Sequence, residues 1–534
     1  MKKHTYIAFA LLLFSFICFF TSCDGKLNVT NPNEETSSDF WTSESDIAEG
    51  VIAVYNRLIL DGSFQRTTPV LVDVRGDDVY SKSAWTIYPE TGDFTVNADY
   101  DVLYWPWREF YQLIEKANLV FYHAPSITFS SSDYKNRLLG QVYFLRALAY
   151  YELALNYQKV PLVLSYPTSS SDYYPSTATE DEIWAAIISD LKKAQADLPT
   201  SYNSVTGDDK GQVGRATWGA ATGLLGKVYM IRQKYDSAAI ELKKVIDSGL
   251  YSLVSNYGDN FTMSNENNSE SLFEVQFTSG GTTENWLGDP TSSWKQASCQ
   301  DYCYGMTAFG AWGDFHPTKW IYNEFKKERC KDGTLDPRLY WTIVSYEPEY
   351  DNYTDGRSNE IFGTYPYKTD VIDSTNSTIY LAKYTYARIS GHTSEGDGSR
   401  DNSFINYRFM RYSEILLLYA EALNELDGPT DDVYKYIQKV RDRVNLPDLE
   451  TTYPNMTQSE MRTQLAHERA LEFGAEDIRL FDLMRWGWFS DSNKLSELEE
   501  HDSEFDTYTT GHQYLPIPQT ELDTNPNLSG NSAN

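Results

Sequence analysis

Apolar residues recur at three- and four-residue spacing along much of the chain beyond residue 100. One such stripe contains Trp107, Phe110, Ile114 and Ala117, and a second extends over 134–157 before the segment Val160-Pro161-Leu162. This spacing places apolar side chains on one face of an α-helix. The hydrophobic pattern therefore predicts two long amphipathic helices in this region.

Further helices are predicted from capping signals and from the same periodicity. Thr179 and Glu182 have capping-box spacing ahead of Ile183, so a helix is expected to begin there and to end at Leu198-Pro199. The next helix is expected to start near Arg215. Three more are predicted over 413–426, 432–444 and 458–473.

The segment 225–250 carries a repeat signal. Leu225, Gly226, Tyr229 and Ala238 occupy positions that are typical of a tetratricopeptide repeat, although the usual Trp and closing Pro are absent. Similar helix pairs are expected over 107–157 and 412–444. The predicted fold class is mainly α, with tetratricopeptide-like helix pairs as a scaffold over about 101–250 and 404–490.

The pattern changes between about 252 and 402. A short string from Leu272 to Phe277 alternates as a strand does, within loops rich in Gly, Ser, Asn, Asp and aromatic residues. A long irregular insertion of this kind is functional or disordered, and its Trp and Tyr content argues against disorder. We expect a loop-rich, ligand-binding half with short strands, within a single domain over 39–534.

The N-terminal segment has the layout of an export signal. Lys2 and Lys3 precede an apolar run over 6–20, which meets Thr21-Ser22-Cys23. This end resembles the lipobox of bacterial lipoproteins. We expect a signal peptide over 1–22, lipidation at Cys23 and a flexible tether over 23–38. The alternative is an ordinary signal peptide cut near Ser22, with Cys23 incidental.

The net charge of the chain narrows the possible binding partners. The formal net charge of −31 disfavours nucleic acid as a partner, because a strongly acidic surface repels phosphate.

Three cysteines remain beyond Cys23. Cys299 and Cys303, four residues apart, could form a local disulfide or stay unlinked, and the sequence leaves both possibilities open.

Catalytic and cofactor motifs are not found in the sequence. His467-Glu468 lacks the second His of a zinc-protease helix, and neither a Gly-x-Ser-x-Gly elbow nor a phosphate-binding loop is present. We therefore expect no catalytic residues, no cofactor and no metal. A glycosidase with two distant carboxylates stays formally open. The acidic run over 395–401 alternates like calcium ligands, but a solvated acidic loop is the favoured interpretation.

Eight motifs, taken in order, resemble the SusD/RagB family of outer-membrane glycan-binding lipoproteins of the Bacteroidota. They lie at 107–118, 145–162 (LRA with Tyr150-Tyr151 and Val160-Pro161-Leu162), 214–229 (GRA, then LLGKVY), 408–422 (RFMRYSEILLLYAEA), 440–443 (VRDR), 468–473 (ERALEF), 479–487 (RLFDLMRWG) and 514–528 (YLPIP, then NPNL). One departure is Tyr157-Gln158-Lys159, where the family commonly has a Gly before an acidic residue.

The resemblance implies four tetratricopeptide-like units, an irregular sugar-binding half and no cleavage of the sugar. It also implies a location on the cell surface, at the outer membrane through the lipid anchor, and a partner, a SusC-like TonB-dependent transporter that this protein would cover as a lid. A peptide-capturing lid, as in the RagB branch, is the alternative.

Aromatic content is the most unusual feature of the composition, with 41 Tyr, 25 Phe and 13 Trp. Most of these residues belong to a core, but Trp and Tyr in polar loops suit the apolar face and hydroxyl rim of a pyranose. The resemblance directs this role to Trp85, Trp286 and Trp312. The full set of expected ligand-binding residues is Trp85, Trp286, Trp312, Trp294, Arg75, Asp77, Tyr88 and Tyr304. The expected ligand is a polysaccharide or oligosaccharide, with a preference for a β-glucan such as xyloglucan.

Overall fold

The computed structural model describes residues 40–278, 297–307, 311–345, 347, 379–385 and 403–534. The expectations for Cys23, Trp286, Trp294 and the acidic run over 395–401 lie outside the described residues.

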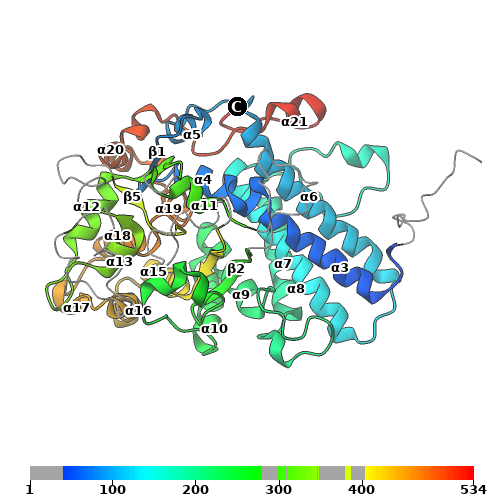
Figure 1. Ribbon diagram of the computed structural model, residues 1–534, viewed down its shortest axis with the longest axis horizontal. Helices are drawn as coiled ribbons and strands as arrows, with labels where there is room; N and C mark the ends of the chain where they lie inside the picture. The colour runs from blue at the N-terminus through cyan, green and yellow to red at the C-terminus, as the bar shows by residue number, and fades with distance from the viewer. Residues whose placement is uncertain (1–39, 279–296, 308–310, 346, 348–378, 386–402) are drawn as a thin grey trace, which may run out of the picture.

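A continuous array of helices forms the helical half of the fold and runs from the right of Figure 1 to its lower left. Successive helices pack against each other in chain order from α6 to α10, and α15 then packs on α10 although a long stretch of chain separates them. The array is lined at one end by α3 and extended at the other by α16 and α18. Its members are α3 (Glu44–Tyr55), α6 (Asp101–His123), α7 (Ser132–Tyr157), α8 (Glu180–Asp197), α9 (Trp218–Ile231), α10 (Tyr235–Asp247), α15 (Tyr412–Asp427), α16 (Asp431–Arg443) and α18 (Gln458–Phe473).

The predicted helices are confirmed, and local sequence explains where α8 starts and ends. Thr179 caps α8, and its hydroxyl and the Glu182 carboxylate form the reciprocal capping box that the spacing predicted. The helix ends at Asp197, two residues before Pro199. The helix expected near Arg215 begins slightly later, with Thr217 as its cap.

The pair α9–α10 has the close approach that its repeat signal predicted. A Cβ added at Gly226 would lie 2.7 Å from the Leu242 side chain of α10, so only glycine fits at this contact. Ala238 is fully buried in the same interface. The mainly helical fold class with tetratricopeptide-like pairs is therefore confirmed.

The departure at 157–159 coincides with the end of α7. Gln158 takes φ +66°, in the region that favours glycine, and its N–H still donates to the Ala154 carbonyl. Its side chain donates to Glu180 at 2.7 Å. The turn thus forms without glycine and is fixed in place by a contact with α8.

The other half contains short strands and short helices, as expected. The strands form three antiparallel pairs: β1 (Val79–Ser81) with β3 (Phe315–Pro317), β2 (Ser271–Val275) with β6 (Tyr407–Arg411), and β4 (Ile343–Val344) with β5 (Tyr380–Leu381). The short helices are α4 (Thr67–Asp73), α5 (Ile87–Gly92), α11 (Gln300–Tyr304), α12 (Lys319–Lys327), α13 (Pro337–Thr342), α17 (Leu449–Thr452), α19 (Arg479–Arg485), α20 (Ser492–His501) and α21 (Gln519–Thr524). Strand β2 is buried after its first residue, because it pairs with β6 along one edge and packs against α9.

Buried ion pairs join the two halves at the ERALEF motif of α18. The Glu472 carboxylate is fully buried and pairs with Arg411 of β6 at 3.0 Å, Arg443 of α16 at 2.5 Å and Arg338 of α13 at 3.3 Å. Burial alone would raise the pKa of Glu472, but its three arginine partners outweigh burial and hold this pKa well below its usual range. Glu468 bridges Arg338 and Arg441 in the same way. The motif is therefore a structural joint between loops and helices.

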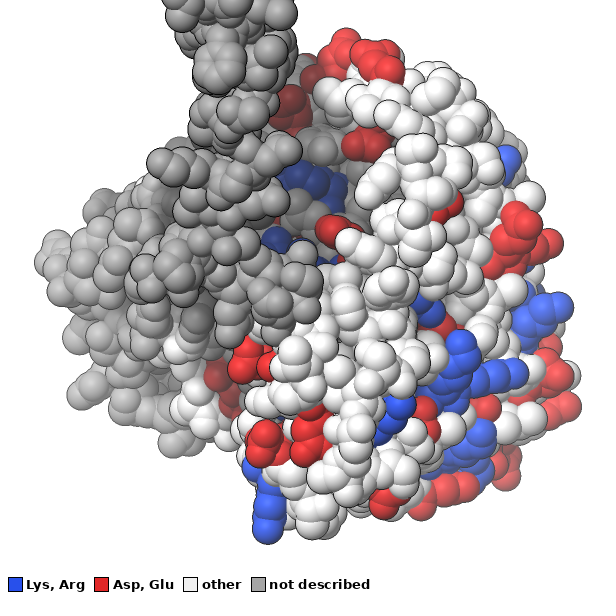
Figure 2. Space-filling model, turned by 90° about the vertical axis from the view of Figure 1, so that its right-hand side faces the viewer, with Lys and Arg blue, Asp and Glu red and all other residues white. Residues whose placement is uncertain are grey.

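Three further features concern possible membrane spans, the charge of the surface and the cysteines. Within the described ranges, no helix combines the length and the apolar content needed to cross a membrane. Figure 2 shows one side of the molecule, on which basic and acidic side chains lie together at the lower right and mainly acidic side chains lie at the top. Cys299 and Cys303 are both buried and are not joined by a disulfide.

Candidate functional site

Strands β1 and β3 bring two aromatic loop segments to one place, near the top of Figure 1. Tyr80 pairs with His316 and Ser81 with Phe315, and the Lys82 N–H then donates to the Asp314 carbonyl at 2.7 Å. Trp85 follows three residues after this bond, and Trp312 lies two residues before it. At ~3.3 Å per extended residue, both tryptophans lie close to the same end of the strand pair.

The ring of Trp85 is partly exposed and lies over a buried, charged arginine. The residue is 44% exposed, and the buried Arg66 guanidinium lies 5.5 Å from the centre of its ring. This guanidinium donates two hydrogen bonds to the Asp61 carboxylate along one edge, from Nε at 2.7 Å and from Nη2 at 2.5 Å. Tyr88 stacks beside the ring, with centroids 6.1 Å apart and planes within 16°. One side of the indole is thereby fixed by the protein, and the exposed part can receive a ligand.

Arg66 stays positively charged although its side chain is buried. Desolvation would lower the pKa of Arg66, but the Asp61 carboxylate outweighs desolvation and raises this pKa above its usual value. The cation–π contact to Trp85 therefore persists over the whole accessible pH range. Arg66 also lies 5.7 Å from the ring of Trp105, which is part of the core.

Trp312 is half-buried and belongs to a segment that is anchored by α11. Its backbone N–H donates to the Tyr302 carbonyl at 2.8 Å, and its ring centre lies 4.2 Å from that of Tyr302. The Asp314 N–H donates to the Cys303 carbonyl at 3.0 Å. Helix α11 is itself tied to the segment before Arg66, because the Cys299 N–H donates to the Gln65 carbonyl at 3.0 Å. The supports of the two tryptophans are thus linked through the backbone.

The polar residues predicted around Trp85 are placed differently from the expectation. Arg75, Asp77, Tyr88 and Tyr304 are all buried. Arg75 donates to the carbonyls of Leu71 and Gln513 and to the Asn156 side chain, and the Tyr304 hydroxyl donates to Asp73.

Asp77 and Tyr88 also have internal partners. Asp77 pairs with Arg479 at 2.5 Å and accepts from His501 at 2.7 Å. Burial alone would raise the pKa of Asp77, but Arg479 overcomes it and lowers the pKa to about 2. Tyr88 packs its ring against Phe315, 5.1 Å between centroids. All four side chains are therefore buried with partners inside the protein, whereas the sequence analysis expected them to be accessible to a ligand.

Other polar groups, which the sequence analysis did not single out, lie beside Trp85. The exposed Thr86 hydroxyl lies 3.1 Å from the Tyr100 hydroxyl, which in turn donates to Glu90 at 2.9 Å. Adjacency to Trp85 in the chain could have indicated Thr86, but nothing in the sequence places Tyr100 or Arg66 here. A flat apolar ring beside hydroxyl and carboxylate groups can bind a molecule that has an apolar face and a polar rim.

A metal site is not formed among the described residues, since no group of three His, Cys, Asp or Glu side chains is arranged to hold an ion.

Comparison with known protein families gives two matches that together cover most of the chain. Residues 269–533 match the model described as SusD family. Residues 27–230 match the model described as "Starch-binding associating with outer membrane".

Individual relatives match this chain over nearly its whole length at low sequence identity. SusD-like protein P25 of Formosa agariphila is 24% identical over 547 residues, covering 99% of this chain and 98% of its own. The crystal structure of a SusD superfamily protein from Bacteroides vulgatus matches with a TM-score of 0.74 and 26% identity, covering 92% of this chain and 100% of its own. Surface glycan-binding protein A from Bacteroides thetaiotaomicron, solved in complex with laminarihexaose, matches with a TM-score of 0.71 and 22% identity, covering 92% of this chain and 99% of its own.

Proposed function

Because the chain belongs to the SusD family, we propose that it binds polysaccharide or oligosaccharide at the surface built around Trp85 and Trp312. The observation that carries this proposal is the exposed indole of Trp85, fixed on its inner side by Arg66 and Tyr88. A pyranose that lies on the outer side would bury apolar area, while Thr86 and Tyr100 offer hydrogen bonds to its hydroxyl rim.

The preferred ligand class under this proposal is a neutral β-glucan. The sequence favoured a β-linked plant glucan such as xyloglucan, and one structural relative was solved with laminarihexaose. Both are chains of neutral pyranoses, so stacking on Trp85 suits either, and the linkage would be selected by residues around the ring. Trp286 and Trp294, which the sequence analysis also expects to bind ligand, would add further stacking positions.

The proposed cellular role is capture of glycan for a transporter. The description of one matching family model includes association with the outer membrane. We propose that lipid on Cys23 holds the protein at the outer face of that membrane and beside a SusC-like TonB-dependent transporter, which it covers as a lid. Anchoring raises the local concentration of the lid at its partner, so the contact between the two need not be strong.

Native affinity electrophoresis against single polysaccharides tests the binding function. We expect migration of the purified protein to be retarded by laminarin or xyloglucan, and the retardation to be lost in a Trp85→Ala, Trp312→Ala variant. The matched control is Tyr453→Ala, which removes an aromatic ring of similar exposure, 51%, at a distant turn. Absence of retardation by every glycan in a panel of α- and β-glucans, together with peptide found in the purified protein, would favour the peptide-capturing alternative.

A further inference from the structure

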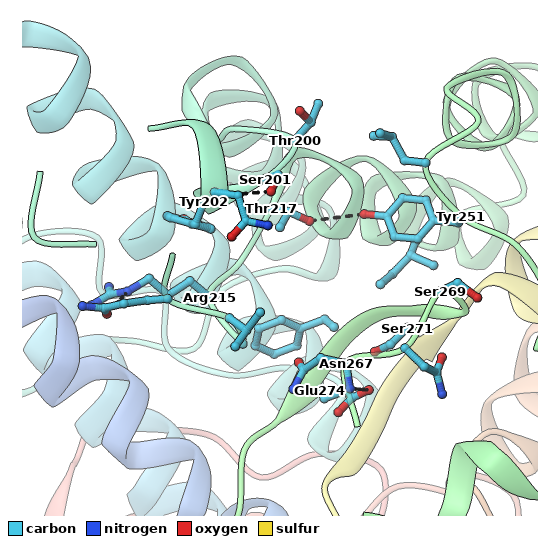
Figure 3. Close-up of a pocket in the computed structure, with 18 of the residues that line it drawn as sticks. Thr200, Ser201, Tyr202, Arg215, Thr217, Tyr251, Asn267, Ser269, Ser271 and Glu274 are labelled. Carbon is cyan, nitrogen blue, oxygen red and sulfur yellow. Dashed lines mark hydrogen bonds between the residues drawn. The ribbon is translucent and has the colours of Figure 1, made fainter. Parts of the chain in front are cut away.

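A cavity of about 210 Å³ lies at a place separate from the Trp85 site (Figure 3). Its walls are the loop 200–217, the end of the turn after α10, and residues 267–274, which include the start of β2. None of its lining residues belongs to the β1–β3 site, and its elements lie in the lower part of Figure 1, while β1 and α5 lie at the top. A ligand in this cavity would therefore not touch Trp85.

The polar lining of this cavity is almost entirely uncharged. Hydroxyl and amide side chains face one another across it, with Tyr251 and Thr217 on one side and Asn267, Ser269 and Ser271 on the other. In a chain with a net charge of −31, such a neutral surface is unusual.

The two charged residues of the described lining are Arg215 and Glu274, and internal partners already engage both. Arg215 donates to Gln212 at 2.7 Å and to Gln141 at 2.8 Å. Glu274 pairs with Arg408 and accepts from Asn406 at 2.9 Å. The Glu274 carboxylate is thus neutralised by Arg408, whereas the two hydrogen-bond partners of Arg215 are neutral amides.

Apolar side chains form the rim. Val213 is 75% exposed and Leu250 is 46% exposed, and Tyr251 adds an aromatic ring to the same lining. Exposed aliphatic groups beside a neutral polar floor suit a ligand that is apolar on one face and hydroxylated at its edges.

The loop that carries Val213 is held in one conformation. The Gly211 N–H donates to the Tyr202 carbonyl at 2.8 Å, and the Tyr202 hydroxyl donates to the Ala216 carbonyl at 2.8 Å. Gly214 has φ +86°, and a Cβ there would lie 2.6 Å from the Gln276 side chain, so the loop requires glycine to pack on β2. The cavity is therefore a preformed feature of the fold.

We propose that this cavity is a second saccharide-binding site, which takes one or two neutral pyranose units. Its volume is below the ~300–1,000 Å³ of pockets for drug-sized ligands, so it accommodates a short unit and not a long segment. The side-chain hydroxyls and amides would bind sugar hydroxyls, and Val213, Leu250 and Tyr251 would cover an apolar face. The acidic residue of the described lining, Glu274, is already paired with Arg408, which argues against a cationic sugar.

This site can be tested independently of Trp85 by introducing a thiol and measuring whether bound sugar protects it from alkylation. Asn203 lines the cavity and is exposed, and Cys299, Cys303 and Cys330 are buried, so Asn203→Cys provides the reactive thiol of the folded domain. We expect at least one sugar from a panel of methyl pyranosides and neutral glucose, xylose and galactose disaccharides, at millimolar concentration, to slow alkylation by iodoacetamide severalfold. The matched control is Lys439→Cys on α16, whose alkylation should not change.

Two added substitutions separate this site from the first. Val213→Lys, at an exposed position, should abolish the protection of Asn203→Cys, whereas Trp85→Ala should leave it unchanged. The proposal is overturned if no neutral sugar slows the alkylation, if only peptides or acidic sugars do so, or if Trp85→Ala removes the protection.

Discussion

Removal of the Trp85 ring should weaken glycan binding by an amount that can be worked out from its exposure. A tryptophan side chain presents on the order of 250 Å². The 44% exposed fraction therefore corresponds to roughly 110 Å², and covering it at ~25 cal/mol per Å² contributes ~2–3 kcal/mol. Trp85→Ala should thus raise the Kd for a bound hexasaccharide roughly 30- to 150-fold.

Isothermal titration with laminarihexaose and with a xyloglucan oligosaccharide measures this change. Trp85→Ala should keep the circular dichroism spectrum of the parent, because the ring lies above the core and the Arg66–Asp61 pair remains intact beneath it. Tyr453→Ala serves as the control and should bind as the parent does. Trp85→Phe should recover part of the affinity, since a smaller ring covers less of the sugar.

An unchanged Kd in a folded Trp85→Ala variant would refute the reasoning, because it would show that no ligand covers the exposed ring. A loss far above 150-fold would also be informative. It would mean that Trp85 organises the neighbouring loop in addition to stacking on the sugar.

Three further predictions concern the scaffold and the anchor. Glu472→Gln should lower the free energy of unfolding by ~3–5 kcal/mol in urea denaturation, because three buried arginines lose their shared carboxylate; an equal midpoint would contradict a structural role. Burial would lower the pKa of His467, but Glu324 and Glu328 raise it from 6.5 to about 9. Its contribution to stability is therefore complete below pH 6.5 and lost as the pH rises through about 9, so the melting temperature should fall over this window in the parent and less in His467→Gln. Cys23→Ala should yield a protein that leaves the membrane fraction, still binds glycan and no longer supports glycan uptake; retention in washed outer membranes would contradict anchoring through Cys23.

Most of the helical half could be predicted from the sequence because its signals are local. Periodicity and caps lie within one element, and Thr179 with Glu182 marked the start of α8 to the residue. Gly226 likewise indicated a close helix contact, which Leu242 supplies in the adjacent helix. Such features need no knowledge of distant parts of the chain.

The site was only partly predictable, because exposure depends on partners that are far away in the sequence. Asp77 lies in a polar stretch and looked accessible, but Arg479 and His501, about 400 residues further on, enclose it. Arg66 has no distinguishing pattern around it, and only the fold places it under Trp85. Polar sequence around an aromatic residue therefore indicates a polar environment without showing whether water or a buried ion pair provides it.

The buried charges around Trp85 have a consequence for binding. An exposed side chain that must be ordered by its ligand loses conformational entropy, which offsets part of the stacking energy. Trp85 is already held by Arg66 and Tyr88, and Arg66 is in turn fixed by the two hydrogen bonds that it donates to Asp61. The Trp85 side chain therefore loses little conformational entropy when a sugar binds. Most of the free energy of stacking on its ring can then contribute to the affinity. This explains why a loop-rich half, which must present accessible aromatic surface, is underlain by so many buried ion pairs: they give loops the rigidity that strands and helices provide elsewhere.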